Sequence, residues 1–133
     1  KEAASWLKTG ISIVNKELVE QILPDGGNFE LSPMYHNIML LDILDLVNIA
    51  HAYDHPEVNS SLVNWYETAS AMLNWMDIML HPDNEIAFFN ITGFSVKSKT
   101  LLFDYGLTYI EPFYEYWIRI IIIHYPVVYC NLT

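Results

Sequence analysis

The sequence predicts an all-α chain built from antiparallel helices. Over residues 1–80 the apolar side chains recur at steps of three and four, the spacing of one face of an α-helix. Stretches rich in Pro, Gly, Asp and Asn separate these segments, as expected of tight turns between helices. With 133 residues, 53% of them hydrophobic, the chain is long enough to bury a core.

The first predicted helix covers residues 2–22. Its apolar stripe recurs at steps of four, three, four and four, in Leu7, Ile11, Val14, Leu18 and Ile22. We expect Lys8, Asn15 and Lys16 to lie away from this stripe. Pro24 and the following "DGG" should end the helix, because Pro cannot continue it and Gly accepts a left-handed backbone.

The second predicted helix covers residues 33–53. Ser32 is suited to cap its N-terminus, and Pro33 suits the first helical position, where a missing N–H costs nothing. The helix is apolar on nearly all sides, so we expect neighbours to bury it. Polar residues at three-residue spacing interrupt it along one edge: Asp42, Asp45 and Asn48.

The third predicted helix covers residues 59–80, between the turn-forming stretches "DHPEVNSS" and "HPDNE". Its aromatic and methionine residues are expected in the core rather than on a sugar-stacking surface: Trp65, Tyr66, Trp75 and Met76. A short extended segment should follow near residues 86–92. Beyond residue 93 the apolar pattern does not distinguish a buried strand from a helix.

The charge distribution excludes several kinds of partner. The formal net charge is −10, and no Lys or Arg occurs between Glu17 and Val96. No basic patch can form there, so we expect neither nucleic acid nor an anionic membrane surface as a partner. The most apolar run, "YWIRIIIIHYPVVY", falls short of the roughly 20 residues that span a membrane and contains Arg119 and Pro126.

Few residues suggest chemistry on their own. Tyr35 either packs in the first turn of its helix with His36 at the surface, or serves as a proton donor or acceptor at a cleft. His51 and His55 are four residues apart, but further ligands are missing, so we expect no metal. The single Cys130 allows no internal disulfide. Without a phosphate-binding Gly-rich loop, we expect no cofactor.

Two longer blocks carry a family resemblance. "ILPDGGNFELSPMYHNIMLLDILDLVNIAHAY" and "MLNWMDIMLHPDNEIAFFN" resemble the N-terminal helical toroid of the heparinase II/III-type polysaccharide lyases, over roughly residues 4–90. The sequence departs from the family pattern at Asn28, where many relatives have His, and at Asn90-Ile91, where Asn-Asp is usual. Residues 1–92 would then be part of an (α/α) toroid, and 93–133 a divergent or truncated segment.

The resemblance implies β-elimination at a uronic acid in an acidic polysaccharide. Tyr35, from the family's Tyr-His pair, would act as acid or base, and His36 and Glu30 would help to position it. The family's Asn-His motif is expected upstream of this chain, and a further catalytic His downstream, in a β-sandwich domain. We therefore expect this chain to be part of a longer protein and inactive by itself. The parent enzyme would be periplasmic or secreted, although the N-terminus shows no signal peptide.

Two other functions remain open from the residues. A glycoside hydrolase on a similar toroid would need two carboxylates across a cleft, for which Glu30 with Asp42 or Asp45 is the available pair. A non-catalytic helical binding module would need neither. The acidic chain would also repel an acidic polysaccharide, so other segments would have to supply cations. Unpartnered toroid helices should make the isolated chain self-associate.

Overall fold

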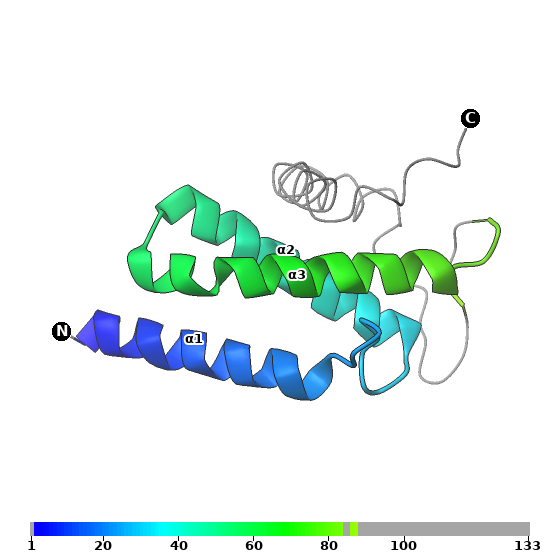
Figure 1. The fold of residues 1–133 in the computed structure, drawn as a ribbon, viewed down its shortest axis with the longest axis horizontal. Helices are drawn as coiled ribbons and strands as arrows, with labels where there is room; N and C mark the ends of the chain where they lie inside the picture. The colour runs from blue at the N-terminus through cyan, green and yellow to red at the C-terminus, as the bar shows by residue number, and fades with distance from the viewer. Residues whose placement is uncertain (1, 84–85, 88–133) are drawn as a thin grey trace, which may run out of the picture.

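The computed structural model describes residues 2–83, 86 and 87. All regular secondary structure in this part of the chain is α-helix. The helices are α1 (Glu2–Gln21), α2 (Pro33–Tyr53) and α3 (Pro56–Met79). Each runs antiparallel to the one before it (Figure 1). The described residues contain no strand, only isolated bridges, which confirms the all-α class. Most of the predicted extended segment and everything beyond it lie outside the described residues.

Helix α2 begins and ends as predicted, because its first and last turns carry the expected capping residues. Ser32 has an extended backbone, and its hydroxyl accepts the N–H of Tyr35 at 3.4 Å. Pro33 occupies the first helical position. At the other end Asp54 takes a left-handed conformation, with φ 39°, and donates its N–H to the carbonyl of Ala50 at 3.1 Å.

Helix α3 begins three residues earlier than predicted, at Pro56 rather than Asn59. Pro56 ends no helix here; it opens one, because Pro is tolerated where the backbone N–H has no helical partner. His55 caps this end, and its Nδ1 accepts the N–H of Glu57 at 3.3 Å. His55 therefore does not continue α2 beside His51.

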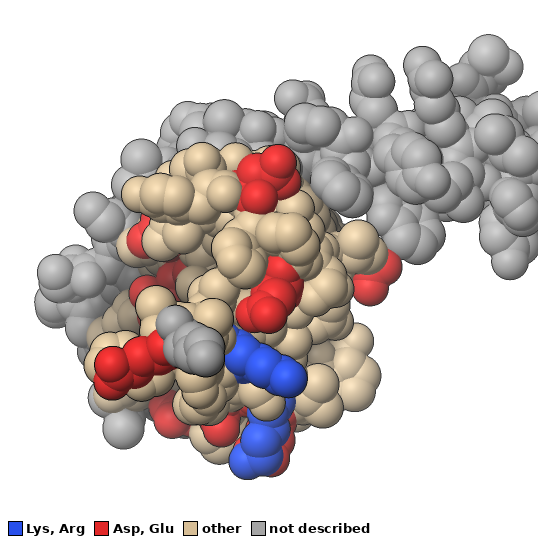
Figure 2. All heavy atoms as spheres, turned by 90° about the vertical axis from the view of Figure 1, so that its left-hand side faces the viewer, with Lys and Arg blue, Asp and Glu red and all other residues tan. Residues whose placement is uncertain are grey.

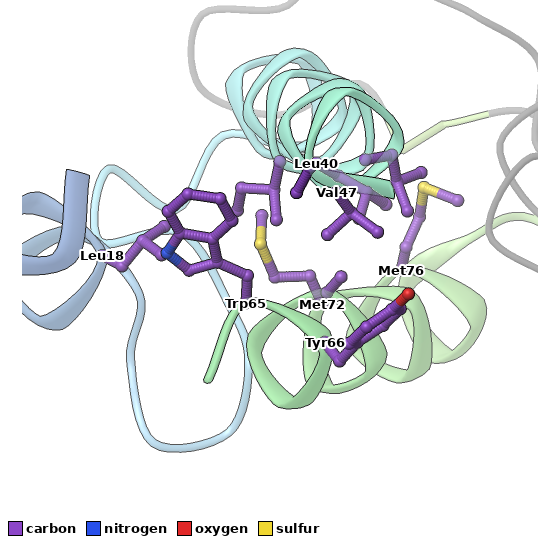
Figure 3. Close-up of a cluster of buried hydrophobic side chains, with 11 residues drawn as sticks. Leu18, Leu40, Val47, Trp65, Tyr66, Met72 and Met76 are labelled. Atoms are coloured by element: carbon purple, nitrogen blue, oxygen red, sulfur yellow. The ribbon is translucent and has the colours of Figure 1, made fainter. Parts of the chain in front are cut away.

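The core lies mainly between α2 and α3, and α1 packs against α3 at the edge of the same core. Leu40 and Val47 of α2 point toward Met72 and Met76 of α3, and Leu18 of α1 approaches Trp65 (Figure 3). Of the predicted core residues, Trp65, Tyr66 and Met76 are each 3% exposed. Trp75 is only half-buried, because it faces the turn before α2 rather than the core. Burial of these apolar surfaces is the main stabilising contribution, at roughly 1.5–3 kcal/mol for each large side chain.

The outer faces of the helices remain apolar at several places. Residues exposed in the described part include Ile38, Ile49 and Tyr53 of α2, so α3 covers α2 on one side only. We expected neighbours on more sides of α2, and those would have to come from other residues. No helix among residues 2–83 is both long enough and apolar enough to cross a membrane.

Asn15 joins α1 to α3, which differs from its predicted place away from the packed stripe. Its side-chain amide donates to the hydroxyl of Ser61 at 2.8 Å and accepts the indole N–H of Trp65 at 2.7 Å. Asn15 lies on the helix between Ile11 and Leu18, at the edge of the apolar stripe. A polar residue there can satisfy the buried indole N–H, which would otherwise lack a hydrogen bond.

The turn between α1 and α2 is folded tightly against α3. The N–H of Leu23 donates to the carbonyl of Gly27 at 2.8 Å, and Gly26 donates back to Leu23 at 2.9 Å. Gly26 has φ +90°, and a Cβ there would lie 2.3 Å from the carbonyl oxygen of Ala71. Only a residue without a side chain can take this conformation so close to the α3 backbone.

Gly26→Ala should therefore destabilise the chain by roughly 2–5 kcal/mol, from the positive φ and from the clash with α3. Gly10→Ala is the matched control, because a Cβ at Gly10 meets nothing within 4 Å and α1 gains helix propensity. Thermal unfolding followed by circular dichroism measures both. A Gly26→Ala variant as stable as the wild type would show that the turn does not pack against α3.

Asn15→Ala should lower the free energy of unfolding by about 1–3 kcal/mol, because the indole N–H of Trp65 loses its acceptor. The measurement is urea unfolding of the variant and the wild type. Ser12→Ala provides a comparison on the same helix, since Ser12 is exposed. Equal losses in the two variants would contradict a specific role for Asn15.

Candidate functional site

The candidate site lies where the turn leads into the first turn of α2. Tyr35 and His36 are consecutive, and consecutive helical residues point about 100° apart. Tyr35 is 36% exposed, whereas His36 is 0% exposed. Tyr35 thus faces outward as the acid/base hypothesis requires. His36 is not at the surface, where the structural alternative for Tyr35 put it.

Helix α3 holds the buried His36 side chain by two contacts one turn apart. The imidazole Nε2 lies 3.0 Å from the backbone carbonyl oxygen of Met72. Because a carbonyl can only accept, Nε2 carries the proton and Nδ1 is the unprotonated nitrogen of a neutral ring. The Trp75 indole packs against the same imidazole, with ring centroids 4.4 Å apart and planes inclined at 35°.

This environment keeps His36 neutral. Burial lowers its pKa from the usual 6.5 to about 4, and the hydrogen bond to Met72 and the carboxylate of Asp25 only partly oppose that effect. A group with this pKa is uncharged at neutral pH. His36 therefore contributes shape and a hydrogen bond beneath Tyr35, and no positive charge.

Glu30 lies in the turn that precedes α2, and Asn28 organises this turn. The buried Asn28 side chain accepts the N–H of Glu30 at 3.0 Å and donates to the sulfur of Met39 at 3.3 Å. Asn28 is thus a structural part of the turn. The Glu30 residue itself is exposed.

Leu31, the residue after Glu30, has a strained backbone. Its φ is +53°, a left-handed conformation that Gly adopts easily but that is costly for a bulky residue such as Leu. Its N–H donates to the carbonyl of Asn28 at 2.9 Å, which closes the turn. Strain of this kind persists only where surrounding contacts hold it, and here it directly precedes Ser32 and the first turn of α2.

The other candidate residues lie elsewhere on the molecule. Asp42 and Asp45 are exposed on α2, in the stripe that begins with Tyr35. His51, near the end of α2, contacts the hydroxyl of Tyr66, and no group of three or more possible metal ligands occurs among the described residues. Two surface grooves, of about 440 and 390 Å³, lie between α1 and α3. Neither is lined by Tyr35, so a cleft at Tyr35 stays a prediction.

Positive charge is distant from the candidate residues along the chain. In the described part Lys8 and Lys16 carry the basic side chains, and both belong to α1. From the side that faces the N-terminus, their blue atoms occupy one region, while acidic groups are spread over the rest of the visible face (Figure 2). Helix α2 and the turn before it contribute only acidic formal charges.

Two residues important to the site were missed in the sequence pattern. Trp75 was grouped with core residues, and burial of His36 was not expected. A signal for His36 was present, since it lies four residues before Leu40 and seven before Ile43, on the buried stripe of α2. The contact of Trp75 with both His36 and the Gly27 turn depends on tertiary structure, and no local pattern indicates it.

Replacing His36 should change the pH dependence of stability. The unfolded chain protonates His36 as the pH falls below 6.5, while the folded chain stays neutral until about pH 4. The free energy of unfolding should therefore fall across that window, by about 3 kcal/mol in total from this residue. His36→Gln removes the titrating group, so the difference in stability between wild type and variant should shrink with decreasing pH.

The measurement is urea unfolding at several pH values between 4 and 7. His81→Gln is the matched control, because it makes the same replacement at an exposed imidazole. Parallel stability curves for the wild type and His36→Gln would mean that the imidazole titrates in the folded chain as it does when unfolded.

Comparison with known proteins agrees with the expected family. The family model described as "Heparinase II/III N-terminus" matches residues 1–113, further than the blocks on which the resemblance rested. A heparin-sulfate lyase of Bacteroides stercoris is 47% identical over 53 residues, which are 40% of this chain and 8% of that protein. The corresponding lyase of Pedobacter heparinus is 46% identical over 43 residues, 32% of this chain and 6% of that protein.

A third heparin-sulfate lyase, from Bacteroides thetaiotaomicron, is 35% identical over 52 residues, which are 39% of this chain and 7% of that protein. The matches thus span less than a tenth of the curated relatives' length. No solved structure matches the chain significantly. The family model covers most of the sequence, and the chain therefore belongs to the heparinase II/III N-terminal family.

Proposed function

We propose that this chain is part of a polysaccharide lyase that cleaves a uronic-acid-containing polysaccharide by β-elimination, with Tyr35 as acid or base. The observation that supports the role of Tyr35 most directly is its position. Its phenol is exposed in the first turn of a helix, and the next residue, His36, is buried and hydrogen-bonded to α3. The family membership and the names of the relatives support the reaction type.

In this reaction a base removes the proton from the carbon next to the uronate carboxylate, and the glycosidic oxygen leaves with a proton. The carboxylate must be neutralised first, because the carbanion is otherwise too costly. A tyrosine hydroxyl needs a partner that takes its proton or stabilises its negative charge before it can act as a base at neutral pH.

Groups other than those of α2 must therefore activate Tyr35 and bind the carboxylate. Within the described residues no Lys or Arg lies on α2, and Asp42 follows Tyr35 by two turns of the same face. Two turns correspond to roughly 10 Å along the helix axis, which is close to a Debye length. Salt therefore weakens, but does not remove, the repulsion between Asp42 and an acidic polysaccharide bound at Tyr35. We propose that cationic and amide groups outside this chain bind the acidic polysaccharide.

Tyr35→Phe in the full-length protein should abolish formation of the unsaturated uronate product, because the variant lacks only the hydroxyl. Tyr53→Phe is the matched control, since it removes the same atom from a tyrosine that is 79% exposed at the far end of α2. The ultraviolet absorbance of the unsaturated product measures the rate on heparan sulfate. Wild-type rates in Tyr35→Phe would refute the acid/base role.

The same assay separates elimination from hydrolysis, the reaction of a toroid glycoside hydrolase. New reducing ends without an unsaturated chromophore would indicate hydrolysis, and Glu30→Gln should then be the inactive variant. If neither product forms with any uronate polysaccharide that binds, the non-catalytic module would be supported.

We also propose that the isolated chain self-associates through its exposed apolar residues. The outward face of α1 carries Trp6 and Ile13, which are 71% and 55% exposed. Apolar surface of this extent is normally covered. The sedimentation coefficient of the chain should rise with concentration, and Trp6→Ser with Ile13→Ser should reduce that rise. A concentration-independent monomer would contradict the proposal.

A further inference from the structure

We propose that Trp75 of α3 is a positioning residue for Tyr35, because its indole packs against both ends of the segment that carries Tyr35. This inference rests on the proposed function, since it concerns the same acid/base residue. Trp75 itself is not proposed to touch the substrate. It would act through the backbone, by fixing where α2 begins.

The first contact of Trp75 is with His36, the residue directly after Tyr35. The two ring centroids lie 4.4 Å apart. One turn earlier on α3, the carbonyl of Met72 binds the edge of the same imidazole at 3.0 Å. A ring held at its edge by a hydrogen bond and at its face by an indole cannot rotate or shift without losing one of the two contacts.

The second contact is with the turn before α2. A Cβ added at Gly27 would lie 2.7 Å from Nε1 of Trp75 and 3.0 Å from Cε2, closer than real contacts allow. The backbone at Gly27 therefore rests directly against the indole. Gly27 and His36 enclose residues 28–35, so one side chain of α3 contacts both ends of that segment.

This arrangement matters because the first turn of a helix lacks the full set of backbone hydrogen bonds and frays easily. Tyr35 is 36% exposed, so its location depends strongly on the backbone that carries it. The segment also contains the strained Leu31, whose left-handed backbone needs surrounding contacts to persist. A misplacement of about 1 Å in a reacting group can reduce the rate about a hundredfold.

The test compares variants of the full-length protein in the lyase assay. Trp75→Leu removes the aromatic face but keeps an apolar side chain, and we expect a decrease in kcat of roughly tenfold to a hundredfold with KM little changed. Trp75→Phe keeps an aromatic ring against His36 and should restore most of kcat. Gly27→Ala should reproduce the loss by displacing the indole from its other side.

Loss of stability alone is the competing explanation, and Asn15→Ala controls for it. Asn15 contacts Ser61 and Trp65, away from residues 28–35, so its variant should melt earlier but retain kcat. Gly10→Ala is the control for Gly27→Ala, since its Cβ meets open space. All rates are measured at a temperature where circular dichroism shows each variant to be folded.

A positioning role requires that Trp75→Leu and Gly27→Ala lower kcat well below the value of Asn15→Ala, with recovery in Trp75→Phe. If both keep the kcat of Asn15→Ala while Tyr35→Phe is inactive, the inference about Trp75 is wrong and the proposed function stands. If Tyr35→Phe is fully active, the proposed function is wrong and the inference falls with it. Should Trp75→Leu not fold, Gly27→Ala and Trp75→Phe decide between these outcomes.

Discussion

A backbone carbonyl has two lone pairs, so Met72 can accept a hydrogen bond from His36 while it remains part of α3. The placement of the turn and of the first turn of α2 depends on this contact. It lies at the end of the molecule where the turn from α1 meets the start of α2, and it holds α2 in the register on α3 that the apolar burial favours. Once His36 is placed, Leu40, Ile43, Leu44 and Val47 follow at helical spacing and form the core.

The turn before α2 has little freedom because it packs against the same part of α3. Gly26 and Gly27 approach the α3 backbone and Trp75 so closely that neither could carry a side chain without displacement. The "DGG" stretch is therefore a packing element as well as a helix stop. Its close approach brings the loop over the same turn of α3 that holds His36. Stability of the turn and placement of Tyr35 thus depend on shared contacts.

Polar residues inside this fold act as connectors between helices. Asn15 links α1 to α3, Asn28 links the turn to α2, and His36 links α2 to α3. Each is held by a hydrogen bond to a neighbouring element, which offsets part of the cost of leaving water, although Nδ1 of His36 is buried without a hydrogen-bond partner. These partners are distant in the chain, which is why the residue pattern misplaced Asn15 and did not indicate what His36 binds.

Within residues 2–83, the amino-acid sequence by itself determined the type of the helices, the cap at Ser32 and the place of Tyr35 in the first turn of α2. Those features follow from local rules, since periodicity, capping and Pro or Gly stops act over a few residues. Only the tertiary structure decided that α3 starts at Pro56, that His36 is neutral and buried, and that Trp75 joins His36 to Gly27. The burial of His36 and its contact with Trp75 depend on which helix faces pack together, and that choice is made by the total apolar surface buried between segments far apart in the chain.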